Sequence, residues 1–431
     1  MNIIHIYNIG TEMYNLMERL FPICRSITGN GVRETLKIIS DYIPINIKEV
    51  PSGTKVFDWK IPDEWNISDA YVENSDGKKV IDFKDNNLHV VGYSEPFNGK
   101  INLEELKNHL YSLPDQPNLI PYVTSYYKRR WGFCVPENQR KHLNKGVYYV
   151  KIDSTLELGS LTYADLVIKG RSQKEILFST YVCHPSLANN ELSGPVVATF
   201  LAKYLLEKKN NYYTYRFVFA PETIGTITYL SKHIEELKRN VIAGYVLTCI
   251  GDGGPFSYLQ SRSGDTLIDR VTMHVLKHSE KEYKLYDYLD RGSDERQYCA
   301  PGVDLPVGSL MRTKYGEYSE YHTSGDNMDL ISSDELNKSL EKLKLCIDII
   351  EKNRIYRSTV LGEPQLGKRG LYPTISTKTS ALNVKTMMDI LAFCDGDHDL
   401  LWIAEKIDKP IMELFPIVET LFQKDLLKII D

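Results

Sequence analysis

The sequence predicts an α/β fold with a mainly parallel sheet and helices on both faces, accompanied by a β-rich module and a small helical module. Between about residues 161 and 350, short apolar runs alternate with helical segments, which is typical of a buried parallel sheet. Between about 51 and 153, the chain consists of short extended runs with many Pro and Asn. After residue 353, two short helical segments are separated by only Asp408 and Lys409.

The first 50 residues are predicted to form a helix followed by a strand. Val32, Leu36, Ile39 and Ile43 share one helical face after the turn TGNG, in which Asn30 is a candidate N-cap. The run IKEV that follows has the character of a strand.

The β-rich module contains three of the chain's four tryptophans: Trp59, Trp65 and Trp131. The residues Ser75, Asp76 and Gly77 predict a hairpin turn. The tryptophans and the stretch YVTSYYKRRWGF have two interpretations. They close over a neighbouring site and stack on sugar rings or peptide side chains, or they pack in the core of their own module.

The α/β part has a regular order of strands and helices. Near-continuous apolar runs predict strands at 175–182, 215–220, 241–251 and 304–311. Amphipathic segments predict helices at 195–207 and 227–239, and Ser333 is a candidate cap for a long helix that carries Leu336, Leu340, Leu343, Ile347 and Ile350.

The C-terminal module has the spacing of a helix-turn-helix but the wrong charge for DNA. From Leu382 to Asp431 it holds five Lys, no Arg and ten acidic residues, and the whole chain has a net charge of -5. Phosphate groups would repel such a surface. We therefore expect a packing or dimerising winged-helix module and no nucleic-acid partner.

Several features predict a cytoplasmic protein with no membrane partner. No window approaches 18 consecutive apolar residues, and the N-terminal stretch lacks the basic region and cleavage site of a signal peptide. The seven cysteines include no C-x-x-C pair, and we interpret them as small buried residues rather than as nucleophiles or disulfides. A homo-oligomer is left open.

Unusual polar residues follow the predicted strands, and in an open parallel sheet the chemistry lies beyond the carboxyl ends of the strands. His184 comes directly after a buried strand, with Asn190 and Glu191 in the same loop. Glu222 ends the next strand, where burial would raise its pKa towards that of a general base. Alternatively, Glu222 is a carboxylate that interacts with a helix dipole. His322 supplies a second imidazole from a later loop.

The strings CHPSLANNELSG, RGSDERQYC and YGEYSEYHTS, in this order, resemble the zinc-dependent aminopeptidase superfamily, which also includes glutamate carboxypeptidases and glutaminyl cyclases. The resemblance covers the N-terminal helices with Arg25, and roughly residues 160 to 350. It is closer to the aminopeptidase-like proteins found with bacterial polysaccharide-biosynthesis genes, which carry a nested β-rich domain and a C-terminal winged helix. The implied domains are 1–54 with 155–352 for the α/β part, 55–154 for the nested domain and 353–431 for the winged helix.

Only some of the superfamily's site residues have a counterpart of the same type in this chain. The first and last metal-binding histidines fall on His184 and His322, and the general base falls on Glu222. Four expected carboxylates are replaced: the metal-bridging Asp by Asn190, the second Glu by Thr223, the later Asp by Thr248 and the Asp that orients the first histidine by Ser186. Since Asn and Thr are poor Zn²⁺ ligands, the resemblance implies one zinc ion or none. Glu191 or Asp294 could complete a rearranged ligand set.

The implied function is that of a zinc-dependent, aminopeptidase-like hydrolase of amides or peptides, linked to surface polysaccharide biosynthesis. Glu222 would take a proton from a metal-bound water, and the resulting hydroxide would attack the amide carbonyl of a small peptide or an amide-bearing sugar. Arg291, Arg296 and Asp294 are candidate substrate contacts, although a structural ion pair would explain these arginines equally well. The alternative is a catalytically reduced protein that binds a small molecule or glycan.

Overall fold

The computed structural model describes residues 9–372 and 378–430, which form two compact units. The first unit comprises Met1–Ile268 and Glu282–Glu341, and the second comprises Asp269–Lys281 and Lys342–Asp431. Within the described residues, no helix combines the length and the apolar character that crossing a membrane requires.

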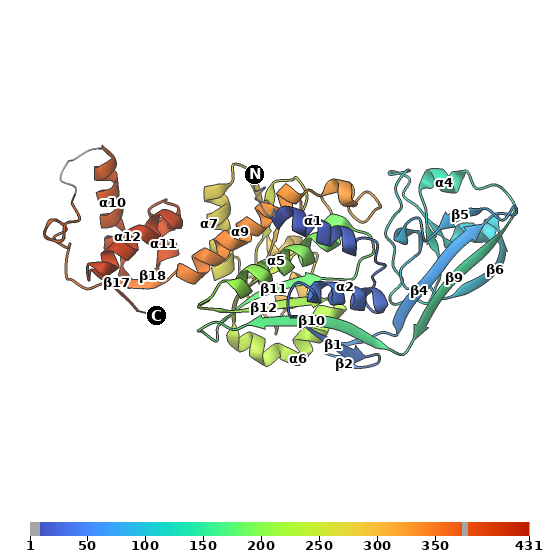
Figure 1. Cartoon of the computed structure of the whole chain (residues 1–431), viewed down its shortest axis with the longest axis horizontal. Helices are drawn as coiled ribbons and strands as arrows, with labels where there is room; N and C mark the ends of the chain where they lie inside the picture. The colour runs from blue at the N-terminus through green and yellow to red at the C-terminus, as the bar shows by residue number, and fades with distance from the viewer. Residues whose placement is uncertain (1–8, 373–377, 431) are drawn as a thin grey trace, which may run out of the picture. The chain divides into compact units, whose positions relative to one another are not determined.

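An eight-stranded sheet organises the first unit, in the order β1-β10-β12-β11-β13-β16-β14-β15. Figure 1 labels β1, β10, β11 and β12 of this sheet. The four central strands β12, β11, β13 and β16 run parallel, whereas β1 and β10 add antiparallel strands at one edge. The fold class predicted from the sequence is therefore confirmed. The strands are β1 (Asn46–Pro51), β10 (Ser160–Ile168), β11 (Glu175–Tyr181), β12 (Thr214–Ala220), β13 (Val241–Leu247), β14 (Phe256–Leu259), β15 (Tyr283–Tyr286) and β16 (Val307–Met311).

Helices cover both faces of this sheet. Helices α1 (Ile9–Leu20) and α5 (Ser193–Glu207) lie on one side, and α6 (Ile224–Asn240) lies on the other (Figure 1). All seven residues of β11 and all seven of β12 are buried, which explains why their sequences read as apolar runs. Gly194 permits the first turn of α5 to approach β13, since a Cβ atom at this position would clash with the carbonyl oxygen of Leu247.

The nested β-rich part is built on a four-stranded antiparallel sheet in the order β5-β4-β9-β6. The predicted hairpin joins β4 to β5, and the Asn74 side chain closes its turn by accepting hydrogen bonds from the backbone of Asp76 and Lys78. The strands and helices are β2 (Lys55–Val56), β3 (Trp59–Lys60), β4 (Glu64–Glu73), β5 (Lys79–Asp82), β6 (Phe97–Asn102), α3 (Leu103–Leu106), β7 (Leu110–Tyr111), β8 (Phe133–Cys134), α4 (Glu137–Lys141) and β9 (Val147–Glu157).

The second unit contains the two adjacent helices expected near the C-terminus, which are α11 (Leu400–Lys406) and α12 (Ile411–Gln423). A small sheet β18-β17-β19 completes it, and Asp399 caps α11 by accepting a hydrogen bond from the backbone of Trp402. The other elements are β17 (Ile355–Ser358), α10 (Lys378–Phe393), β18 (Asp395–Asp399) and β19 (Leu427–Ile429).

Both helix caps predicted from the sequence were placed one residue too late. Helix α2 (Asn30–Ser40) begins with Asn30, and its N-cap is Gly29, which has a φ of 95° that favours glycine. The long helix α9 (Ser333–Lys352) includes Ser333, and the Ser332 hydroxyl accepts the hydrogen bond from the Glu335 backbone. Helix α7 (Leu267–Ser279) was not anticipated from the sequence.

Candidate active site

A pocket of about 350 Å³ lies where the polar loops after the parallel strands meet. His184, Glu222 and His322 all line this pocket, so the structure brings together the three residues that the resemblance singled out. Arg296 also lines it, whereas Arg291 lies exposed beside the Tyr288 ring and does not.

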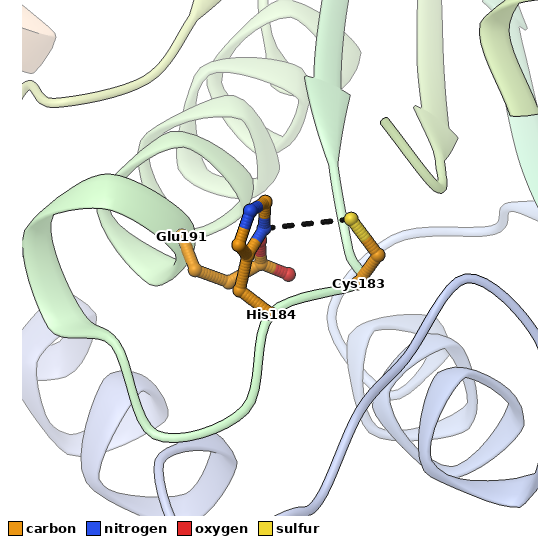
Figure 2. A group of neighbouring side chains, drawn as sticks. All are labelled: Cys183, His184 and Glu191. Atoms are coloured by element: carbon orange, nitrogen blue, oxygen red, sulfur yellow. Dashed lines mark hydrogen bonds and ion pairs between the residues drawn. The ribbon is translucent and has the colours of Figure 1, made fainter. Parts of the chain in front are cut away.

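His184 follows β11 and is oriented by Glu191, which projects from the π-helical turn η3 (Ala188–Leu192). The Nδ1 atom of His184 lies 2.7 Å from Glu191 Oε2, and Figure 2 shows the two side chains together with Cys183. Burial lowers the pKa of His184 to about 3, so the imidazole is neutral. With Glu191 as a carboxylate, Nδ1 carries the proton and Nε2 presents its lone pair to the pocket.

The guanidinium of Arg25 places a positive charge beside the paired side chains of His184 and Glu191. Its side chain is fully buried; Nε donates to the backbone oxygen of His184 at 3.0 Å and lies 3.6 Å from Glu191 Oε1. Burial raises the pKa of Glu191, and the guanidinium of Arg25 opposes that rise. Glu191 therefore contacts the imidazole on the side away from the pocket, in the orienting role that an Asp at position 186 has in the superfamily.

Glu222 lies opposite the free nitrogen of His184, with Oε2 at 3.7 Å from Nε2. Its side chain is a quarter exposed, and burial together with the negative charge of Asp294 raises its pKa. Asp294 is buried and accepts a hydrogen bond of 2.8 Å from the backbone of Thr223. Asp294 thus fixes the turn that carries Glu222, rather than lining the pocket.

The positions that lack carboxylates form a neutral hydrogen-bond network. Asn190 Nδ2 donates to the Tyr181 hydroxyl at 2.9 Å, and this hydroxyl also contacts the Thr248 hydroxyl. Thr248 in turn donates to the backbone oxygen of Asn190 at 2.8 Å. These groups satisfy one another and carry no negative charge, so they do not fit a second metal ion.

His322 completes the pocket from a loop in a left-handed conformation, with a φ of 55°. Its Nε2 atom lies 3.1 Å from Asn190 Oδ1, and its ring centre is 5.6 Å from that of His184. Burial and the nearby His184 lower the pKa of His322 to about 3. The Tyr122 ring lies 5.1 Å from each of the two imidazoles and covers both.

The nested part is joined to this loop by backbone hydrogen bonds. The Tyr122 amide donates to the His322 oxygen at 2.8 Å, and the Ser324 amide donates to the Ile120 oxygen at 2.8 Å. Trp59, Tyr126 and Tyr127 line the pocket with Tyr122, whereas Trp65 is buried in the core. Some of these aromatic side chains therefore line the pocket and others pack in the core, and stacking on a substrate stays a prediction.

Asp326 is a supporting residue that the sequence reasoning missed. Its carboxylate accepts hydrogen bonds from the backbone amides of Ala188, Asn189 and Asn190, and from the Tyr318 hydroxyl. It thereby holds η3, which carries Asn190 and Glu191. Asp326 lies in the string YHTSGDN, so its position four residues after His322 was the available signal.

Several residues around the pocket also have strained backbone conformations. Ten non-glycine residues of the described chain have positive φ, and four of them lie in the loops around the pocket: Ser186, Thr223, Cys249 and His322. Such conformations persist where the surrounding structure enforces them, often at functional sites.

The candidate metal-binding side chains divide into a buried group behind His184 and the two imidazoles that line the pocket. Within the described residues, a single group of three or more His, Cys, Asp or Glu side chains has donor atoms within 4.8 Å of one another, namely Cys183, His184 and Glu191. This group fits poorly, because Arg25 lies beside it and burial raises the pKa of the Cys183 thiol well above its usual range. His184 Nε2 and His322, which both reach the pocket, are the better candidate ligands, and the neutral Asn190 oxygen beside His322 would be a weak third donor.

The parallel sheet and the site at its strand ends define an aminopeptidase-like α/β fold. Residues 14–353 match the family described as Domain of unknown function (DUF4910), and residues 354–429 match a winged helix-turn-helix family. The chain belongs to the DUF4910 family.

Three known proteins are similar to this chain in sequence or in structure. A Clostridium acetobutylicum protein, named as a candidate polysaccharide biosynthesis protein with an aminopeptidase-like domain, is 49% identical over 98% of this chain and 97% of its own. A crystal structure of a candidate peptidase from the same species has 48% identity, covers 98% of this chain and 96% of its own, and gives a TM-score of 0.92. A zinc aminopeptidase from Bacillus subtilis, at 13% identity, 79% and 94% coverage and a TM-score of 0.56, shares the fold.

Proposed function

We propose that this protein is a metal-dependent hydrolase of amide bonds that acts on a small peptide or an amide-bearing sugar. The observation that carries the proposal is the facing pair in the pocket: Nε2 of His184, oriented by Glu191, lies 3.7 Å from the carboxyl of Glu222. A general base beside a neutral, pre-oriented imidazole is the arrangement that metal-assisted hydrolysis requires.

The residues of the pocket have distinct roles in this proposal. His184, His322 and the Asn190 oxygen would hold one Zn²⁺ ion, which supplies Lewis acidity to a carbonyl and to water. The raised pKa of Glu222 suits it to accept the proton of the attacking water and to pass it to the leaving amine. Tyr122 and Tyr126 exclude solvent from the imidazoles, which strengthens the electrostatic interactions in the pocket.

Arg296 provides a contact for an anionic group of the substrate. Its guanidinium donates to the Ser293 oxygen and the Thr223 hydroxyl, both of which are neutral. A carboxylate or phosphate near the scissile amide would therefore find an arginine that has no direct ion pair within the part of the chain that the structure describes. Arg291, which lies outside the pocket, has no such role.

The cellular setting is also a proposal. The name of the Clostridium acetobutylicum relative links that protein to polysaccharide biosynthesis, and we extend the link to this chain. All seven cysteines are free, which suits a reducing cytoplasm. The acidic composition of the C-terminal helices supports a packing role rather than binding to nucleic acid.

The first test of the proposal is a measurement of the metal content per chain. We expect about one zinc ion per chain after purification without a metal-binding tag, and loss of that ion in His184→Ala and in His322→Ala. His142→Ala, which removes an exposed imidazole outside the pocket, serves as the matched control and should retain the metal.

Turnover is tested with Glu222→Gln. This variant should keep the metal and the fold but lose hydrolysis in a screen of amino-acid amides, dipeptides and N-acyl sugars. Hydrolysis that persists at the wild-type rate would refute the role of Glu222.

A second candidate function follows from the neutral network of Asn190, Tyr181 and Thr248. A site that has lost its bridging carboxylate can retain the pocket as a binding site for a small molecule or glycan without chemistry. This alternative predicts tight association with a small ligand and no turnover with or without added Zn²⁺.

A further inference from the structure

A second hollow, of about 370 Å³, adjoins the candidate active site. Trp59 lines both hollows. Ile224 of α6 lines the active-site pocket, and Ile227, about one helical turn further, lines the second hollow. Arg296 lines the active-site pocket, and the next residue, Gln297, lines the second hollow. The two hollows are therefore neighbours along one helix and one loop.

The chemistry of the second hollow differs from that of the pocket. It is lined by three aliphatic residues from one stripe of α6, the largely buried Ile227 and Leu230 and the half-buried Ile234, and Val303 adds a fourth. Among the described residues that line it, Asp58 is the one charged side chain. A molecule that occupied both hollows would need a polar end and an apolar end.

An aromatic hairpin forms the boundary between the hollows. Strands β2 and β3 meet in a turn at Phe57, which is 46% exposed and has a φ of 52°, an uncommon conformation for a bulky residue. Trp59 is 36% exposed and packs edge-on against Tyr127, which is 69% exposed. Exposed aromatic side chains beside a pocket, one of them on a strained backbone, indicate a binding function.

We propose that this hollow, the α6 groove (Phe57, Trp59, Ile227, Leu230, Ile234 and Val303), binds an alkyl or acyl chain of the substrate. The polar, amide-bearing end of the same molecule occupies the pocket with Arg296. The inference rests on the proposed hydrolase function and narrows its substrate class to amphiphilic amides. Because the groove and the pocket share Trp59 as a common wall, one molecule could reach both, which favours a chain of the substrate over a separate ligand.

Calorimetric titration with two probes tests the groove. N-acetylglycine and N-decanoylglycine share an amide and a carboxylate, and they differ only in the length of the acyl chain. We expect N-decanoylglycine, used below its micelle-forming concentration, to bind at least about tenfold more tightly, since each buried methylene adds to affinity. Equal affinities, or no detectable binding of N-decanoylglycine, would overturn the inference.

Two variants test whether the long acyl chain binds in the α6 groove. Ile234→Asp places a charge in the groove and should abolish the advantage of the long chain while leaving the affinity for N-acetylglycine unchanged. Leu206→Asp, on the exposed surface of α5, makes the same type of change elsewhere and should preserve the advantage. Circular dichroism confirms that both variants are folded. An advantage that survives in Ile234→Asp would show that the chain binds elsewhere.

The binding role of the α6 groove and the hydrolase function can be refuted independently of each other. Binding requires no turnover, so Glu222→Gln should retain the long-chain advantage while losing hydrolysis. A wild-type protein that shows the advantage but hydrolyses no amide would refute the hydrolase and leave the groove. Hydrolysis without any chain-length dependence of binding would refute the groove alone.

Discussion

Glu191→Gln is the most informative single change in this protein. The Glu191 side chain is fully buried between two partners, with Oε1 at 3.6 Å from Arg25 Nε and Oε2 at 2.7 Å from His184 Nδ1. Glutamine preserves the shape and keeps an oxygen that can accept the imidazole proton. It removes the negative charge that faces the buried guanidinium of Arg25.

The expected loss of stability follows from these contacts. Removal of one partner from a buried ion pair costs about 3–5 kcal/mol, because the other charge stays buried without compensation. The hydrogen bond that glutamine retains offsets about 1 kcal/mol of this cost. We therefore expect the free energy of unfolding of the α/β unit to fall by about 2–4 kcal/mol. If burial instead kept Glu191 protonated at neutral pH, glutamine would be a near-isosteric replacement and the loss would vanish.

Urea unfolding at pH 7, followed by circular dichroism and fitted with separate transitions for the two units, measures this loss. Glu207→Gln, on the exposed end of α5, is the matched control and should change stability by no more than about 0.5 kcal/mol. A similarly small change in Glu191→Gln would refute a charged pair. The double variant with Arg25→Met should cost less than the sum of the single changes.

Two further predictions concern acid stability and the support of η3. In the presence of a chelator, the protein should lose stability as the pH falls from about 6.5 towards 3. The reason is that the folded-state pKa of His184, lowered to about 3, keeps the imidazole neutral while the unfolded chain takes up a proton. For His184 this amounts to about 2 kcal/mol at pH 5, and thermal melts of His184→Gln should show a correspondingly shallower pH dependence; an equal dependence would contradict the lowered pKa. Asp326→Ala removes the acceptor of three backbone amides and should lower both the melting temperature and the zinc content, whereas the exposed-site variant Asp334→Ala should change neither.

The sequence was sufficient to predict the architecture because burial on both faces of a parallel strand leaves a strong signal. Strands β11, β12, β13 and β16 each appear as an apolar run, and the helices between them appear as periodic segments. β10 was missed although eight of its nine residues are buried, because Thr162, Tyr163 and Asp165 interrupt its apolar run. Short strands such as β14 and β15, of four residues each, carry too little pattern to be recognised.

Within the candidate site, the residues that follow strands were predictable from the fold, whereas His322, in a later loop, was indicated by the resemblance. His184 and Glu222 directly follow buried strands, so their convergence in one pocket follows from the parallel order of the sheet. Tyr122 and Trp59 reach the same pocket from the nested part, and no spacing in the sequence relates that part to the strand ends. Asp326 acts through backbone amides, so its position four residues after His322 was the only signal in the sequence and did not indicate which groups it would bind.

Glu191 shows why a site cannot be transferred position by position. The superfamily orients its first histidine with an Asp two residues later, and this chain has Ser186 there, with a φ of 44° and a hydroxyl that donates to the Phe21 oxygen. The carboxylate that orients His184 comes instead from Glu191, because the π-helical turn η3 directs this side chain back to Nδ1. Because Glu191 is bonded to Nδ1, it would not also bind a metal at Nε2, so at the proposed metal site Glu191 would support a ligand rather than act as one. The same chemical requirement, a neutral imidazole with its proton fixed on one nitrogen, is thus met by a different element of the fold.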